Sequence, residues 1–94
     1  MSDIVKIEAG GIVAEVDKGV TEDVRFATAM ARLSDETVPE SEKLVWFTRA
    51  LEILFCGNTY AIQSELAKAN GGRLTEDVFS SFFNEVMEQL ASKN

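Results

Sequence analysis

The longest apolar pattern in the chain runs from Glu40 to Cys56 and has the spacing of an α-helix. At this spacing its apolar residues form two sets on two sides of the helix. The first set is Leu44, Phe47, Leu51, Leu54 and Phe55, and the second is Trp46, Ala50 and Ile53. Since the polar residues leave only a narrow band for water, we predict a central helix over residues 39–56 that neighbours cover on two sides.

Three other segments, residues 22–33, 59–69 and 76–91, also have helical spacing. Thr21 and Thr75 are predicted to cap the first and last of these helices, and Asn58 the third in chain order. The first helix is predicted to bury Val24, Ala27, Met30 and Ala31, with Phe26 and Leu33 as further candidates. The helix over 59–69 is predicted to bury Tyr60, Ile62, Leu66 and Ala69. The last helix is the most regular, with Val78, Phe79, Phe82, Phe83, Val86, Met87 and Leu90 at intervals of three and four residues.

Residues 4–16 show a different pattern, in which apolar and polar residues alternate around Gly10 and Gly11. Period-2 alternation on both sides of a glycine turn predicts a β-hairpin. Its buried face is expected to carry Val5, Ile7, Ile12, Ala14 and Val16. Because a two-stranded hairpin alone is marginal in water, this one must lie on the helices, extend another sheet, or pair with a second copy of the chain.

These elements predict a mainly α fold of the α+β class. An N-terminal hairpin would be followed by a four-helix, bundle-like domain around the central apolar helix. A chain of 94 residues has the size of one domain. The apolar fraction of 46% and the charged fraction of 27% are those of a folded chain. We therefore expect residues 1–94 to form a single domain.

The net charge of −7 changes the range of expected partners. An acidic surface repels phosphate groups, so binding to nucleic acid is disfavoured. No apolar run reaches the roughly 18 residues of a membrane span, so we expect no membrane partner. Cys56 is the single cysteine, and the N-terminus lacks the pattern of a signal peptide. Both features predict a protein of the reducing cytoplasm.

The residues that usually carry chemistry are scarce. The chain has no histidine, the commonest general base and transition-metal ligand. Cys56 lies at the C-terminal end of a predicted helix, where the dipole disfavours a thiolate, and we interpret it as a core residue. The acid pairs Glu22/Asp23 and Glu76/Asp77 follow capping threonines and suit the helix dipole. We expect no catalytic residue, cofactor or metal, and therefore not an enzyme.

Aromatic residues are the main candidates for function. Six phenylalanines, one tryptophan and one tyrosine are a large load for a small domain. A stripe at helical spacing is more often core than docking surface, and both interpretations stay open at this point. The surplus is expected to contact a partner protein or a second copy of the chain. The candidate partner-binding residues are Trp46, Phe79, Phe82, Phe83 and Met87.

Taken in order, the elements resemble the tail assembly chaperones of long-tailed bacteriophages and prophages. The similar stretches follow a short N-terminal hairpin, and they are EDVRF at 22–26, LFCGNTY at 54–60 and GGRLTEDVFSSFFNEVMEQL at 71–90. The likeness covers about residues 20–94. It consists of the order of the elements and of scattered identities.

This resemblance implies a non-enzymatic protein of the bacterial host cytoplasm. Such a protein would bind the tape-measure protein, keep its apolar segments from aggregating, and assist tail-tube assembly together with tail-tube subunits. Acidic charge around an apolar helix face would also attract lysine-rich stretches of a helical client.

The acidity suggests an alternative, a small acidic regulatory protein or DNA mimic that blocks a basic site on a host factor. Such a protein would bind with strong salt dependence, whereas a chaperone would make apolar contacts that depend weakly on salt.

Overall fold

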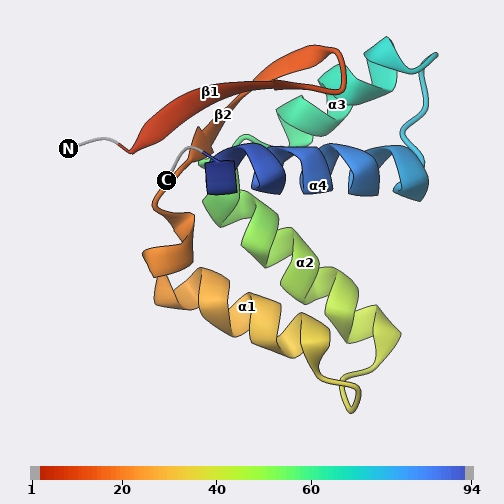
Figure 1. Cartoon of the computed structure of the whole chain (residues 1–94). Helices are drawn as coiled ribbons and strands as arrows, with labels where there is room; N and C mark the ends of the chain where they lie inside the picture. The colour runs from red at the N-terminus through yellow and green to blue at the C-terminus, as the bar shows by residue number, and fades with distance from the viewer. Residues whose placement is uncertain (1–2, 93–94) are drawn as a thin grey trace.

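The computed structural model describes residues 3–92 as a β-hairpin followed by a helical domain (Figure 1). The elements in chain order are β1 (Ile4–Ala9), β2 (Ile12–Asp17), the short 3-10 helix η1 (Val20–Glu22), α1 (Val24–Ser34), α2 (Glu40–Leu54), α3 (Thr59–Ala69) and α4 (Glu76–Ser92). This order confirms the predicted mainly α fold with an N-terminal hairpin.

The hairpin has the predicted buried face. β1 and β2 pair antiparallel, with Ile7 opposite Ala14. Gly10 and Gly11 turn the chain with φ of +58° and +84°, a region that favours glycine. Of the predicted residues, Ile7, Ile12, Ala14 and Val16 are buried and Val5 is half-buried. Ala9, which was not predicted, is buried on the same face. The alternation in the sequence therefore identified the correct face of both strands.

The hairpin lies on the helices, which is the first of the three expected arrangements. β1 packs on α4, and β2 packs on α3 and α2. At the hairpin tip, a Cβ added to Gly10 would lie 3.0 Å from Leu66 Cδ2 and 3.2 Å from Phe82 Cδ1. On the β1 side, Gln89 Nε2 of α4 donates a hydrogen bond of 2.8 Å to the Glu8 carbonyl. The strands thus share one core with the helices.

The core lies between the hairpin, α3, α4 and the second half of α2. Its largest fully buried side chains include Phe55, Phe82, Leu51, Leu54, Leu66, Val16 and Val86. The rings of Phe55 and Phe82 lie with centroids 5.9 Å apart. Phe55 follows α2 and Phe82 belongs to α4, so this pair joins the end of the central helix to the last helix.

α1 and α2 form a helical hairpin on the side of α4 away from the β-strands (Figure 1). α1 packs mainly against α2. Its buried side chains are Phe26 and Ala29, and Met30 and Leu33 are half-buried. Counted from Phe26, the other three positions lie three, four and seven residues further along, so the four form one face of the helix.

The prediction that α2 is covered on two sides along its length is wrong for its first two turns. Ala50, Leu51 and Leu54 are buried, as expected. Leu44 is 67% exposed, however, and Val45 is 47% exposed. The physical reason is that these turns belong to the α1–α2 hairpin, which extends away from α4 in Figure 1. Fewer neighbours are available there than around the C-terminal half of α2.

The predicted inner face of α1 is also corrected. Val24 is 76% exposed, and Ala27 and Ala31 are exposed too. The helix begins at Val24, two residues later than predicted, because Asp23 rather than Thr21 is the N-cap. Two apolar rows were available on this helix, and α2 covers the row that contains the bulkier Phe26.

On α3, Ile62 and Leu66 are buried as predicted, but Tyr60 is 82% exposed. Tyr60 and Ile62 are two residues apart, a rotation of roughly 200° about the helix axis, so their side chains point to nearly opposite sides of the helix. Only one of them can face the hairpin. Ala69, in the last turn, is exposed as well.

One of the two remaining predicted helix caps is present. Asn58 precedes α3 without forming the expected side-chain cap. Thr75 Oγ1 does accept a hydrogen bond of 3.4 Å from the Val78 amide at the start of α4.

Cys56 is exposed, so its interpretation as a core residue is wrong. The residue lies just past the end of α2 with φ of +55°. Around it, the Gly57 amide donates to the Glu52 carbonyl at 2.8 Å and the Cys56 amide donates to the Ile53 carbonyl at 3.4 Å. These two bonds form a Schellman helix end, which turns the chain and leaves the Cys56 side chain outside the core.

Candidate functional site

The five predicted partner-binding residues do not lie together. Phe82 and Phe79 are buried, with 2% and 8% of their surface exposed. Phe83 and Met87 are half-buried on α4, and Trp46 is half-buried on α2. Phe82 and Phe79 therefore offer little surface to a partner, which leaves Phe83, Met87 and Trp46 as candidates. The remaining candidates divide between two sides of α2, the side that faces α4 and the side that faces α1.

The aromatic residues of α4 mainly hold α4 against α2. The Phe47 ring lies edge-on to Phe79 at 5.9 Å and to Phe83 at 5.5 Å, measured between ring centroids. Phe79 also stacks with Phe82 at 6.1 Å. Edge-to-face and offset pairs at such distances are favourable in cores. The cluster that looked like a docking stripe in the sequence is thus largely an α2–α4 contact.

Trp46 faces the other side of α2, where α1 and α2 together form a groove of about 480 Å³. α1 contributes Val24, Arg25 and Thr28, and α2 contributes Trp46, Arg49, Glu52 and Ile53. We name this feature the α1–α2 groove. Its apolar floor combines a half-buried indole with the strongly exposed Val24 side chain.

The indole of Trp46 is held by polar groups from both helices. Its Nε1 donates a hydrogen bond of 3.3 Å to Glu42 Oε2 on α2. The guanidinium carbon of Arg49 lies 4.7 Å from the ring centroid, and that of Arg32 on α1 lies 5.6 Å from it. A cation within about 6 Å of an indole face is attracted to it. These contacts place two arginines at the edge of an apolar groove.

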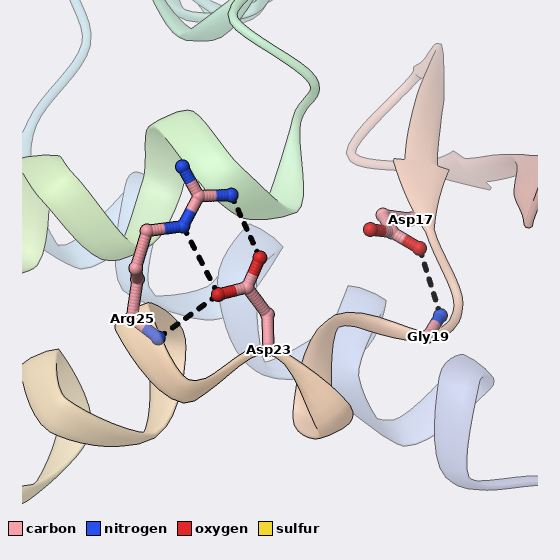
Figure 2. A network of polar contacts seen from close by, with 4 residues as sticks. All are labelled: Asp17, Gly19, Asp23 and Arg25. Atoms are coloured by element: carbon pink, nitrogen blue, oxygen red, sulfur yellow. Dashed lines mark hydrogen bonds and ion pairs between the residues drawn. The ribbon is translucent and has the colours of Figure 1, made fainter.

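A third arginine, Arg25, is fixed at the start of α1 (Figure 2). Asp23 Oδ1 accepts a hydrogen bond of 2.9 Å from the Arg25 amide, which caps the helix. The Arg25 side chain donates back to Asp23 through Nε at 3.1 Å and Nη2 at 2.7 Å. This hydrogen bonding lowers the pKa of Asp23 to about 2. Figure 2 also shows Asp17 accepting a 2.9 Å bond from the Gly19 amide in the preceding turn.

Three of the four arginines in this acidic chain therefore surround the α1–α2 groove. Arg32 and Arg49 form no ion pair with any carboxylate of residues 3–92. Sequence analysis named Trp46 but missed these residues. The spacing of Trp46 and Arg49, three residues apart on a helix, was a signal that they lie side by side. Arg32 comes from another helix, so no local pattern could have found it.

A second groove lies on the opposite side of α2, between its first turns, α3 and the start of α4. It holds about 470 Å³. Leu44, Phe47, Leu74 and Phe79 supply its apolar surface, and Glu76 and Asp77 lie among its polar lining. The charge at its rim thus differs in sign from that of the arginines around Trp46.

Residues 3–92 offer few reactive groups. No three or more histidine, cysteine or acidic side chains in this part of the chain are placed to hold a metal ion. Although the Cys56 side chain is exposed, partial desolvation raises the pKa of its thiol, with further contributions from the charges of Asp17 and Glu15. A raised pKa keeps the thiol protonated and makes it a poor nucleophile.

Over residues 3–92, none of the helices has the length and apolar character needed to cross a bilayer.

Comparison with protein-family models, curated proteins and solved structures found no match to this chain.

Proposed function

We propose that this protein is a non-enzymatic binding module for a helical segment of another protein, acting as a phage or prophage tail assembly chaperone. The observation that carries the proposal is Trp46, which lies half-buried in the groove between α1 and α2. Tryptophan and arginine are the residue types that most often dominate binding at protein interfaces. Both types meet in this groove.

The shape of the groove supports a helical client. Two helices packed side by side leave a long depression that a third helix can fill, as in small helical bundles. Val24 and Ile53 both line this depression, one on each helix. A client with apolar residues at three- and four-residue spacing would cover them together with the indole. Burial of this surface would provide the main driving force.

In this proposal the client is the tape-measure protein, a long helical protein with apolar segments. The chaperone would cover such a segment in the bacterial cytoplasm until tail-tube subunits assemble around it. The order of elements and the stretches that resemble this family support the assignment. The expected client-binding residue on α2 is Trp46, and the half-buried Phe83 and Met87 on α4 remain candidates for a second contact.

Co-purification with the tape-measure protein of the same phage or prophage tests this proposal. Trp46→Ala should abolish co-purification while the helical circular dichroism spectrum is unchanged. Tyr60→Ala is the matched control, because Tyr60 is an aromatic residue that is 82% exposed on α3, away from the groove. Retention of the client by both variants would contradict the proposal.

The salt dependence of binding separates this function from the acidic alternative. A DNA mimic would bind a nucleic-acid enzyme through many carboxylates, and its affinity would fall steeply with added salt. A client held mainly by apolar contacts loses much less affinity over the same range. Titration of the tape-measure protein at low and high salt therefore distinguishes the two functions.

A further inference from the structure

We infer that the open edge of β2 binds an extended segment of a protein other than the helical client. The segment adds to the hairpin as a third strand, in the groove between β2 and α3, and carries a lysine or arginine where it passes Glu15. This inference goes beyond the proposed function and does not depend on it, because the surface belongs to other elements than the α1–α2 groove and holds a strand instead of a helix.

The register of the hairpin shows which backbone groups face outward. The Lys18 amide donates to the Asp3 carbonyl at 2.9 Å, which makes these two residues a hydrogen-bonded pair. In an antiparallel ladder such pairs alternate with pairs whose N–H and C=O groups point away from the partner strand. Counted along the register from Asp3 and Lys18, Val13 and Glu15 of β2 belong to the outward-pointing pairs.

The β1 edge is partly covered, whereas the β2 edge is open. Gln89 of α4 donates a hydrogen bond of 2.8 Å to the outward carbonyl of Glu8 on β1. No hydrogen bond within residues 3–92 reaches the outward amide or carbonyl of Val13 or Glu15. Both residues are exposed, with 60% of the Val13 surface accessible. An edge strand with unpaired backbone groups is a template for pairing with another chain.

The groove beside this edge fits an added strand. Its β2 wall consists of four consecutive residues, 12–15. One face of a strand would contribute only every second residue, so the edge itself borders the groove. The α3 wall is one face of the helix, formed by Asn58, Ala61, Ile62 and Glu65. At about 210 Å³ the groove has less than half the volume of the α1–α2 groove, so it suits an extended chain better than a helix about 10 Å across.

Most of the groove lining is apolar. Ile12 and Ala14 contribute from β2, and Ala61 and Ile62 contribute from α3. Successive side chains of a strand point to opposite faces, so every second side chain of the added strand would pack over α3. In strand addition the backbone hydrogen bonds give affinity, and the alternate side chains give specificity. The segment therefore carries apolar residues at alternate positions.

The end of the groove near Cys56 is acidic. Partial desolvation raises the pKa of the Cys56 thiol, and the charges of Asp17 and Glu15 raise it further, with no opposing contribution from a cation of the described chain. Lys6 lies opposite Glu15 in the ladder but is not ion-paired with it. A cationic side chain of the added strand is therefore favoured beside Glu15.

The other end of the groove carries both signs of charge. A Cβ added to Gly11 at the hairpin tip would lie 3.9 Å from Ala69 Cβ, so β2 and α3 run in opposite directions. This arrangement places Glu65 toward the tip, away from Glu15. Lys68 follows Glu65 by one helical turn and carries the opposite charge. Charge complementarity thus applies to one end of the segment only.

Residue-resolved hydrogen exchange of the full chain, with designed strand peptides, tests the inference. The first peptide alternates valine and threonine and carries lysine at both ends, so that either direction of binding is served. At about ten times its Kd, this peptide should slow the exchange of the Val13 and Glu15 amides about tenfold. The second peptide has the same side chains, but all of its amides are N-methylated. It should protect neither amide, because it has no backbone donors and its methyl groups block the ladder.

Substitutions of Val13 supply the reciprocal experiment. Val13→Pro removes an outward N–H and leaves the ladder with β1 intact, because proline is tolerated on an edge strand where its N–H would face solvent. This variant should lose protection of the Glu15 amide by the first peptide. Val13→Thr keeps both the amide and the β-branched shape, so it should keep that protection. Trp46→Ala should keep it too, which separates this surface from the α1–α2 groove. Circular dichroism establishes that each variant is folded.

A third peptide, with glutamate in place of the terminal lysines, tests the charge preference. We expect it to bind about fivefold more weakly, the effect of one exposed ion pair. Equal binding of the lysine and glutamate peptides would overturn the inference. So would equal protection by the N-methylated peptide, or no protection of Val13 and Glu15 by the first peptide. Protection of these amides in the protein alone that disappears on dilution would also overturn it, because a second copy would then occupy the edge.

Discussion

The guanidinium of Arg49 lies 4.7 Å from the centre of the Trp46 ring, one helical turn away on α2. Arg49→Ala should uncover this face of the indole and shift its fluorescence emission to longer wavelength. It should also lower the free energy of unfolding by about 0.5–1 kcal/mol, the contribution of an exposed cation–π contact. Emission spectra and urea unfolding measure the two effects. An unchanged emission maximum would show that the arginine does not cover the ring in solution.

The tip of the β-hairpin gives a prediction about the core. Gly10→Ala should destabilise the fold by about 2–4 kcal/mol, because it combines a strained positive φ with a clash. Its Cβ would lie 3.0 Å from Leu66 Cδ2 and 3.2 Å from Phe82 Cδ1. Gly11→Ala is the matched control. It has φ of +84° but meets only Ala69 Cβ at 3.9 Å, so it should cost about 1 kcal/mol. Equal losses in chemical unfolding would mean that the tip does not pack closely on α3 and α4.

The end of α2 predicts a stabilising substitution. Cys56 has φ of +55° at a position where the equivalent residue after α3 is Gly71, with φ of +83°. Cys56→Gly should raise the free energy of unfolding by about 1 kcal/mol, since glycine adopts this conformation without strain. The exposed thiol contributes no core packing that would be lost. A lower urea midpoint in the glycine variant would contradict the Schellman geometry at this helix end.

The Asp23–Arg25 pair predicts how stability depends on pH. The folded state lowers the pKa of Asp23 from 3.8 to about 2. A group whose pKa is lowered by folding stabilises the protein above its unfolded pKa and loses that effect as the pH falls through the folded value. Asp23→Asn keeps an N-cap residue but removes the charge. The thermal midpoint of the variant should therefore lie below that of the unmodified protein at neutral pH, and the two should converge between pH 3.8 and about 2. A constant difference over that range would contradict the assignment.

Local patterns in the sequence predicted the elements well because each element follows its own period. The alternation from Val5 to Val16 identified the buried face of the hairpin. The three- and four-residue spacing of Phe79, Phe82 and Val86 identified α4 and its buried side. In such segments the local period and the tertiary packing agree.

The errors arose where a helix offers more than one apolar row. On α1, spacing could not decide between the row of Val24 and the row of Phe26, because the choice depends on where α2 lies. On α2, spacing indicated two apolar sides but could not show that the first turns extend beyond the body of the protein, which leaves Leu44 exposed. In both cases the position of the neighbouring helices, and not the local spacing, determines which residues are buried.

The candidate site was predictable only in part. Trp46 was identified as a surplus aromatic residue, and it does line a groove. The α4 aromatics were harder to interpret, because a docking stripe and a core stripe have the same period. The cluster of arginines depends on bringing α1 against α2, so it became visible only in three dimensions.

Hydrogen exchange of the protein with and without its tape-measure protein tests the central claim most directly. Protection from exchange reports which helices become more stable or less accessible on binding. We predict slower exchange in α1 and α2, over residues 24–34 and 44–53, with α3 unchanged over 59–69. Slower exchange confined to α3 or to the hairpin strands, with α1 and α2 unchanged, would contradict a client site centred on Trp46.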